Sequence, residues 1–391
     1  MHISADLCGG NISVLHMPGE HVAELALRPD SAAAIKQWFH FKARVERGVP
    51  AEYRIQNAGE ATYRGSWDGY RALASYDLER WFRIPTTFDG RSLVLRHTPD
   101  RRIVYYSYFA AYPLARHQAL VARAQASRRA RVTTIGKSLE QRPIEVIEIG
   151  KVGRPRRRIW IVTRQHPGET QGEWFLEGLL DRLLDEHDAF VDALLDEAVL
   201  YIAPNMNPDG SARGNFRTNV AGRDLNREWK DPSDQASPEI LCLKDTIDDT
   251  GVDLFLDVHG EESAPCAFFL GCEGNPGYGA HQRELERRFA DDLAGRDRHF
   301  WRDYNYGPDD PGKGDLRISN NYVGERYGCL AVTLEMPFKE GGAHPGHGGA
   351  LSFSPEVAKH LGRVTLETIA GLVGSLRRPP SRGSSETPPR P

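Results

Sequence analysis

Short apolar runs alternate with longer amphipathic segments between residues 114 and 376. The runs have the length of buried strands, and the longer segments repeat apolar residues at the spacing of a helix. We predict strands at 158–163, 198–203, 252–258 and 329–334, and helices at 114–127, 170–184, 238–248, 281–294 and 355–376. Ser354 and Pro355 give the last helix a plausible start, because proline is tolerated in a first turn. The alternation predicts an α/β layered domain with a largely buried sheet.

The first 112 residues have a different pattern. Short strand-like segments at 12–15, 38–45, 93–95 and 103–109 are separated by turn residues, which is typical of a β-sandwich. After residue 376 the chain is rich in proline, serine and charge, and too poor in apolar groups to offset the entropy of ordering. We therefore predict a β-sandwich domain at 1–113, an α/β domain at 114–376 and a disordered tail at 377–391.

Composition narrows the range of partners. The chain has 391 residues, 27% of them charged, and a formal net charge of −4, so no basic field directs it to nucleic acid or to an anionic membrane. No segment approaches the roughly 20 apolar residues of a membrane span, and the start MHISADLCGG lacks an export signal. Five scattered cysteines fit reduced thiols better than a disulfide framework. We expect a cytoplasmic protein whose oligomeric state the sequence does not indicate.

Four polar stretches follow predicted strands, and such positions line the ligand crevice of an open α/β sheet. They are HPGE at 166–169, the NPDG turn at 207–210, DVHG at 257–260 and the glutamate at 335. His166, Glu169 and His259 supply two imidazoles and a carboxylate, which is a ligand set for a catalytic zinc ion with an open fourth position. One turn would present two ligands, and the third would come from another strand.

Each of these three residues also has an ordinary structural explanation. His166 can cap a strand, Glu169 can favour the first turn of a helix, and His259 can be a satisfied core histidine. Because all three occur together at strand ends, we predict one zinc ion per chain. A second histidine-bearing stretch, AHPGHGG at 343–349, has no carboxylate or cysteine close by and is predicted to be a flexible loop.

A hydrolytic zinc site also needs a base and a positive partner for a developing oxyanion. Glu335 stands behind an apolar strand, where loss of water raises proton affinity and suits a general base. Arg217 can polarise a carbonyl, and Asn226 with Arg227 forms a fork of donors that suits a carboxylate. Most arginines are surface charges, but these cluster after the NPDG turn, which favours a role at a site.

The order of HPGE, NPDG, FR, DLNR, DVHG and LEMPF resembles that of the zinc metallocarboxypeptidases, in the form of the cytosolic carboxypeptidase branch. The resemblance is strong from about residue 120 to residue 376 and weak before it. It implies a mixed sheet flanked by helices after a smaller all-β sandwich, and an enzyme that acts on peptide or protein C-termini. The residue roles that it implies are zinc binding by His166, Glu169 and His259, proton transfer by Glu335, oxyanion stabilisation by Arg217, terminal-carboxylate binding by Asn226 and Arg227, and orientation of His166 by Asp224.

The terminal residue that such an enzyme would remove stays open. The segment at 312–317 lies where the resemblance places the pocket for the terminal side chain, and basic residues there suit terminal glutamate or aspartate. Lys313 and Arg317 are therefore either substrate-binding cations or solvated loop charges. The family's substrate-covering tyrosine is also unassigned, and the candidates are Tyr304, Tyr306, Tyr322 and Tyr327.

Two other functions fit parts of the pattern. Succinylglutamate desuccinylase and aspartoacylase, which are zinc amidohydrolases, resemble it in a His-x-x-Glu, a DLNR and a later histidine. The NPDG turn, the LEMPF glutamate and the N-terminal sandwich fit carboxypeptidases better. A non-catalytic module that binds C-termini would be expected to lack a zinc ligand or the base, and all four residues are present. Bound zinc together with peptide hydrolysis would distinguish the enzyme from the module.

Overall fold

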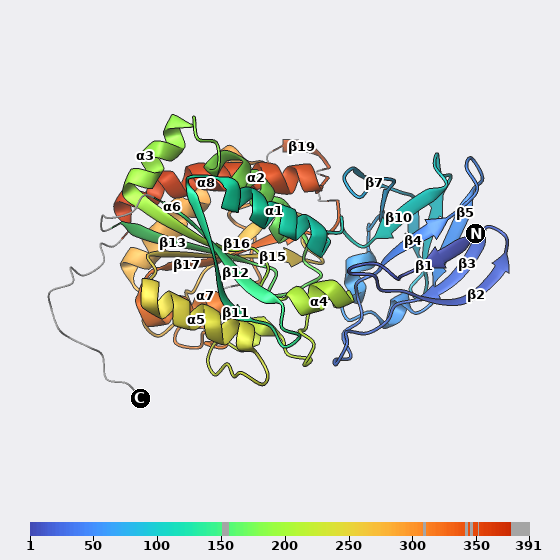
Figure 1. Cartoon of the computed structure of the whole chain (residues 1–391), viewed down its shortest axis with the longest axis horizontal. Coiled ribbons are helices and arrows are strands. Elements are labelled where there is room, and N and C mark those ends of the chain that lie inside the picture. Colours follow the sequence, from blue (N-terminus) through green and yellow to red (C-terminus); the bar gives the residue numbers. More distant parts are fainter. Residues whose placement is uncertain (151–155, 308–309, 341–342, 345–346, 351, 377–391) are drawn as a thin grey trace.

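The computed structural model describes residues 1–150, 156–307, 310–340, 343–344, 347–350 and 352–376, so the tail predicted at 377–391 lies outside the described residues. Figure 1 shows an all-β N-terminal domain beside a larger α/β domain, which begins with helix α1 (Leu114–Ala126). No described helix is long and apolar enough to cross a membrane.

The N-terminal domain consists of two five-stranded sheets with an aromatic core. The rings of Phe41, Tyr53 and Tyr106 lie 4.7 to 5.5 Å apart in this core. Among the described strands, all neighbours pair antiparallel except β3 and β5. This domain confirms the predicted all-β sandwich. The strand orders are β1 (His2–Ser4), β4 (His40–Arg44), β10 (Ile103–Ser107), β6 (Leu73–Ser75), β7 (Trp81–Arg83), and β2 (Ser13–Gly19), β3 (Val22–Ala26), β5 (Ala51–Ile55), β9 (Leu93–His97), β8 (Thr86–Phe88).

A seven-stranded mixed sheet forms the centre of the second domain, as predicted. Its four inner strands β14, β13, β15 and β17 run parallel, and β11, β12 and β16 are antiparallel to their neighbours along the sheet. The carboxyl ends of the parallel strands therefore meet at one edge. In order across the sheet, the strands are β11 (Ala130–Lys137), β12 (Pro143–Ile149), β14 (Ala198–Ala203), β13 (Arg157–Thr163), β15 (Leu254–Glu261), β17 (Leu330–Pro337) and β16 (Phe268–Leu270).

Strand β13 explains why this sheet is covered on both faces. Ile159 and Ile161 pack into one core, Trp160 and Val162 pack into another, and all four side chains are fully buried. Because successive residues of a strand point to opposite faces, such a run needs a helix layer on each side. Figure 1 shows these layers, with α2, α6 and α8 on one face and α5 and α7 on the other. The helices are α2 (Gln171–Leu183), α6 (Ala280–Arg296), α8 (Pro355–Leu372), α5 (Pro238–Thr250) and α7 (Ser319–Tyr327).

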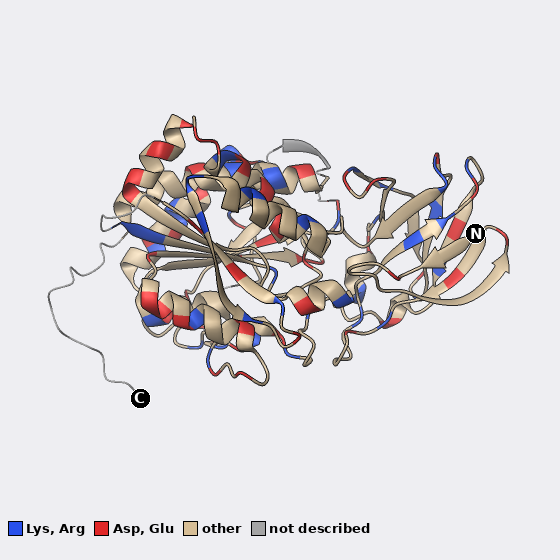
Figure 2. Cartoon of the chain, in the orientation of Figure 1, with Lys and Arg blue, Asp and Glu red and all other residues tan. Residues whose placement is uncertain are grey.

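The start of the last helix, α8, follows the sequence signals. The Ser354 hydroxyl accepts the N–H of Val357, and Pro355 occupies the first turn of α8, as predicted. Three shorter helices were not predicted: α3 (Ala189–Glu197), α4 (Pro208–Arg213) and α7. Basic and acidic positions are interspersed along the helices of the domain (Figure 2), so no helix layer carries charge of one sign.

Strands β11, β12 and β16 were not predicted, and the expected loop at 343–349 also differs from the sequence-based expectation. Strand β11 was missed because its positions are mostly exposed or half-buried and its sequence ARVTTIGK has no apolar run. Residues 343–344 and 347–350 form two short paired strands, β18 and β19, in place of the predicted flexible loop. Pairing between these strands satisfies backbone groups that a loop would leave to water. Residues 345–346 lie outside the described residues.

The interface between the domains reaches the predicted site. Asp30 of the N-terminal domain accepts hydrogen bonds from the backbone N–H groups of Phe216, Arg217 and Thr218 at 2.6, 2.9 and 2.8 Å. The Ala110 carbonyl, in the segment between the domains, accepts hydrogen bonds from two side chains at the start of α2. The N-terminal domain is thus bonded directly to the loop that carries Arg217.

Candidate active site

The HPGE segment forms a tight turn between β13 and α2. Arg164 has a left-handed backbone conformation, with φ of 58°, which is uncommon for a residue with a side chain. Its buried guanidinium secures the turn by donating to Glu173 at 2.6 Å and to the Pro167 carbonyl at 2.5 Å. A Cβ on Gly168 would lie 2.5 Å from the ring of Phe216, so only glycine fits. The turn thereby places Glu169 beside His166.

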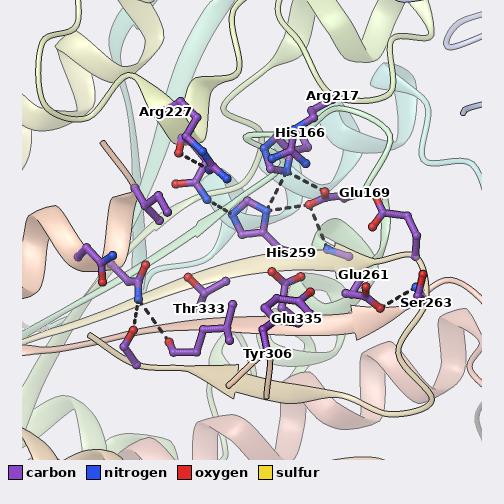
Figure 3. A pocket seen from close by; sticks show the side chains of 18 of the residues that line it. His166, Glu169, Arg217, Arg227, His259, Glu261, Ser263, Tyr306, Thr333 and Glu335 are labelled. Atoms are coloured by element: carbon purple, nitrogen blue, oxygen red, sulfur yellow. Dashed lines mark hydrogen bonds and ion pairs between the residues drawn. The ribbon is translucent and has the colours of Figure 1, made fainter. Parts of the chain in front are cut away.

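His166, Glu169 and His259 point toward one another (Figure 3), and their ligand atoms lie within 4.8 Å of one another. Glu169 Oε1 is 2.7 Å from His166 Nδ1, and Glu169 Oε2 is 2.8 Å from His259 Nδ1. All three side chains are buried. In the part of the chain that the structure describes, this is the one cluster of histidine, cysteine and acidic side chains that could hold a metal ion.

An aspartate holds the other ring nitrogen of each histidine. Asp224 Oδ1 lies 2.9 Å from His166 Nε2, and Asp257 Oδ2 lies 2.8 Å from His259 Nε2. Each aspartate favours a proton on Nε2 and so leaves Nδ1 as the ligand atom. Two imidazole nitrogens and a carboxylate, with one position open, fit the preferences of a catalytic zinc ion.

The electrostatics of the cluster also suit a cation. Burial favours neutral Glu169, but His166 and His259 outweigh it and hold the pKa of that carboxyl well below its usual range. Burial opposes ionisation of Asp224 as well, and His166 and Arg217 hold its pKa below the usual range. Two carboxylates therefore stay negative in a buried site, where a divalent cation neutralises charge.

Glu335 lies across from the metal cluster on the neighbouring strand. In the pairing of β15 with β17, His259 is opposite Glu335. Burial raises the pKa of Glu335 to about 8. Both residues line a cavity of about 500 Å³ at the carboxyl edge of the sheet, where ligands of α/β domains bind.

Three further predicted residues line the same cavity: Arg217, Asn226 and Arg227. Arg217 donates from Nε to Asp224 Oδ2 at 2.8 Å. Arg227 donates to the Asn226 carbonyl at 2.8 Å, and Asn226 Oδ1 accepts the N–H of Ser319 at 2.9 Å. Figure 3 shows Arg217 close to His166, with Arg227 on the opposite side of the metal cluster from Glu261.

Lys313 and Arg317 lie elsewhere. Both are exposed and neither is among the described lining residues, and Arg317 pairs with Asp315 at 2.8 Å. The structure therefore does not bring these two predicted substrate-binding residues to the cavity, because the polar segment that carries them faces solvent. Of the four candidate tyrosines, Tyr306 alone lines the cavity, beside Glu335 in Figure 3.

Asp257 and Tyr63 are among the residues of the site that sequence reasoning missed. Asp257 had a usable signal, because it precedes His259 by two positions on a strand and so shares its face. Tyr63 of the N-terminal domain had none, since nothing in the sequence places it near the sheet. It nevertheless lines the cavity with Arg217, and its ring packs 5.8 Å from that of Phe216.

Comparisons with known proteins agree with this geometry. Residues 3–109 match the cytosolic carboxypeptidase N-terminal domain, and residues 117–345 match the zinc carboxypeptidase family. A metallo-carboxypeptidase from Pseudomonas aeruginosa, solved in complex with (2-guanidinoethylmercapto)succinic acid, is 41% identical, with a TM-score of 0.92 over 96% of this chain and 100% of that chain.

Two relatives known by sequence extend the comparison. An uncharacterized protein of Zymomonas mobilis is 39% identical over 376 residues, which are 96% of this chain and 97% of that protein. Cytosolic carboxypeptidase 2 of Xenopus tropicalis is 27% identical over 313 residues, which are 70% of this chain but 32% of that protein. The resemblance inferred from the sequence motifs is confirmed: this chain belongs to the zinc carboxypeptidase family and carries the N-terminal domain of the cytosolic carboxypeptidases.

Proposed function

We propose that this chain hydrolyses the last peptide bond of peptide or protein C-termini, with one zinc ion per chain. The observation that carries the proposal is the grouping of three metal ligands, a buried carboxyl group and a carboxylate-binding pair around one cavity. A zinc ion held by His166, Glu169 and His259 would activate a water molecule and polarise the scissile carbonyl.

The remaining steps belong to side chains of the chain itself. Glu335 accepts a proton from the attacking water, whose oxygen forms a bond to the carbonyl carbon. Arg217, fixed by Asp224, donates N–H groups to the carbonyl oxygen as it becomes negative. The C–N bond then breaks, and Glu335 returns the proton to the leaving amine. A carboxyl group whose pKa burial raises to about 8 suits both transfers at neutral pH.

Exopeptidase character rests on Arg227 and Asn226. They line the cavity on the side away from Glu261 and offer donors to a free terminal carboxylate. The compound bound by the Pseudomonas aeruginosa relative contains a succinic acid group, which presents carboxylates of the same kind. An endopeptidase would have no use for a carboxylate-binding pair next to the metal ligands.

Two finer expectations have unequal support. A cytoplasmic location is supported by the five cysteines, all of which are free thiols. The preference for terminal acidic residues rests on Lys313 and Arg317, and the cavity lining lends it no support. The acidic preference stays a prediction, and peptides that differ only in their last residue can test it.

A pair of peptides that differ only at the C-terminus tests the proposal. A free terminal carboxylate should be required, so amidation should reduce kcat/KM by about 100-fold or more. Arg227→Gln should reduce this discrimination, whereas Arg223→Gln, on the same loop but paired with Glu228, should not. Equal cleavage of the free and amidated peptides would refute the proposal. Cleavage of N-acetylaspartate or succinylglutamate, with no cleavage of peptides, would favour the amidohydrolase alternative.

A further inference from the structure

The cavity has two ends, and the proposed function determines which end receives the terminal side chain. Asn226 is hydrogen-bonded to the backbone of Ser319, so the carboxylate-binding pair adjoins the start of α7. Thr333, two residues before Glu335 on the same face of β17, lies toward Arg227 in Figure 3, whereas Glu261 and Ser263 lie on the opposite side. A terminal residue held by Arg227 therefore directs its side chain toward Thr333, and the rest of the peptide leaves past Glu261.

Among the residues that the structure describes, no free cation lies at the end that receives the terminal side chain. The described lining residues include five glutamates and two arginines. Neither arginine is available to bind the terminal side chain. Arg217 is bonded to Asp224 beside the metal cluster, and Arg227 lies at the carboxylate position. Leu270 is opposite Thr333 in the pairing of β16 with β17, and Asn320 is bonded to the Gly271 carbonyl. Glu273, Ile318 and Asn321 line the same cavity. A terminal carboxylate side chain would meet no positive partner there.

Two asparagines that line the cavity have amide nitrogens bonded to the backbone, which leaves their amide oxygens as the remaining acceptors. The amide nitrogen of Asn320 donates to the Gly271 carbonyl at 2.6 Å, and that of Asn321 donates to the Asp315 carbonyl at 3.3 Å. If either side-chain amide were rotated by 180°, its oxygen would face a backbone carbonyl oxygen. The backbone carbonyls therefore hold the amide nitrogens in place, and the amide oxygens are left to accept hydrogen bonds. Asn321 is 4% exposed, and its Oδ1 has no hydrogen-bond partner among the described residues. A buried acceptor without a partner is costly until a donor arrives.

Glu273 adds a negative charge to these acceptors. A Cβ on Gly271 would lie 3.0 Å from Glu273 Oε2 and 2.6 Å from Glu286 Oε2, so both carboxyl groups lie against this glycine. Glu286 is occupied, because it accepts hydrogen bonds from the Tyr278 hydroxyl at 2.5 Å and from the Cys272 N–H at 3.3 Å. Glu273 forms no ion pair with a described lysine or arginine, and it lines the cavity.

We infer that the pocket for the terminal side chain selects a cationic donor, arginine or lysine, through Glu273 and the amide oxygens of Asn320 and Asn321. The inference rests on the proposed function and opposes the acidic preference that Lys313 and Arg317 suggested. Arginine brings five N–H donors and lysine three, which match a lining made of acceptors. A terminal glutamate would add a sixth carboxylate to the cavity and leave the acceptors unsatisfied.

A panel of peptides tests this with the zinc-loaded, full-length chain. Peptides that differ only in their last residue, Arg, Lys, Leu or Glu, should give kcat/KM values for Arg and Lys about 100-fold or more above that for Glu. Glu335→Gln, which should bind peptides without turning them over, should show the same order in binding. A preference for Glu or Leu, with hydrolysis intact, overturns the inference and leaves the proposed function standing. If no peptide with a free C-terminus is hydrolysed, both fail.

A variant then tests the residue itself. In Glu273→Gln the ratio of kcat/KM for Arg over Leu should fall by about 10-fold or more, since the charge is lost and the shape is kept. The matched control is Glu284→Gln, an exposed glutamate on α6 that pairs with Arg287, and it should leave the ratio unchanged. An unchanged ratio in Glu273→Gln would remove Glu273 from the pocket. The peptide panel on the unaltered chain can refute the inference by itself, so the test does not depend on whether the variant folds.

Discussion

Replacing Asp30 tests how far the N-terminal domain builds the active site. Asp30 is 4% exposed and accepts the backbone N–H groups of three consecutive residues of the Arg217 loop, as well as the Thr218 hydroxyl at 3.0 Å. The same loop supports the zinc ligands, because the carbonyl of Phe216 accepts the N–H of Gly168 at 2.8 Å. Asp30→Ala removes both carboxylate oxygens, and with them all four hydrogen bonds.

The expected loss of stability follows from the groups left behind. Three backbone N–H groups lose their partner at a buried interface, and each costs about 1 to 2 kcal/mol, so the free energy of unfolding should fall by about 4 kcal/mol. Asp30→Asn should cost less, about 2 kcal/mol, because one oxygen remains and one N–H of the loop faces an NH₂ group. Both variants should reduce kcat more than they raise KM, since Arg217 acts on the charge that develops during the reaction.

Urea unfolding, zinc content and steady-state kinetics on the full-length chain measure these effects together. Asp89 is a matched control: its exposed carboxylate accepts the N–H groups of Arg91 and Ser92 in a turn of the same domain. Asp89→Ala should cost much less stability than Asp30→Ala and leave kcat unchanged. If Asp30→Ala kept the stability and the kcat of the unaltered chain, the reasoning about the interface would be wrong.

Three other predictions follow from the site and its surroundings. Glu335→Gln should keep zinc and bind peptides but lose about 10² to 10⁴ in kcat, and near-normal kcat would place the proton acceptor elsewhere. His259→Ala should lose most of its zinc in a metal assay while its circular dichroism stays native, and full zinc retention would defeat the ligand assignment. Burial lowers the pKa of His117, but Glu173 and Glu145 outweigh it and raise the pKa to about 9 from the usual 6.5. This stabilising contribution, at most about 3 kcal/mol, is complete below pH 6.5 and is lost as pH rises through 9, so the difference in unfolding free energy between the unaltered chain and His117→Gln should shrink over that range. A difference that stays constant with pH would contradict it.

The inner strands and the metal cluster could be predicted because their signals are local. Buried parallel strands need continuous apolar runs, and residues that follow such runs share one edge of the sheet. That logic gave His166, Glu169, His259 and Glu335 without any knowledge of distances, and the structure groups all four around one cavity. Edge strand β11 failed the same test because one of its faces meets water, so its sequence carries no apolar run.

The terminal-residue pocket could not be predicted, because loop side chains are placed by tertiary contacts. Lys313 and Arg317 lie in the expected stretch of sequence, yet the chain turns them to solvent and brings Asn320 and Asn321, a few residues later, to the cavity. Glu273 carries no signal at all, since its approach depends on a glycine that lets two carboxyl groups come close. A shift of a few residues in this loop replaces two cations with two neutral amides at the cavity wall.

The accessory domain is better understood as part of the active site than as an appended module. Tyr63 contributes to the cavity wall, Asp30 holds the Arg217 loop, and the Ala110 carbonyl bonds to the start of the helix that follows the zinc ligands. Each contact lies within one or two residues of a group that acts on the substrate or the metal. Small shifts in such groups carry large costs in rate, because catalysis depends on geometry held to a fraction of an ångström. An α/β domain without its partner would lose, at once, the support of the loop that carries Arg217 and of the turn that carries Glu169.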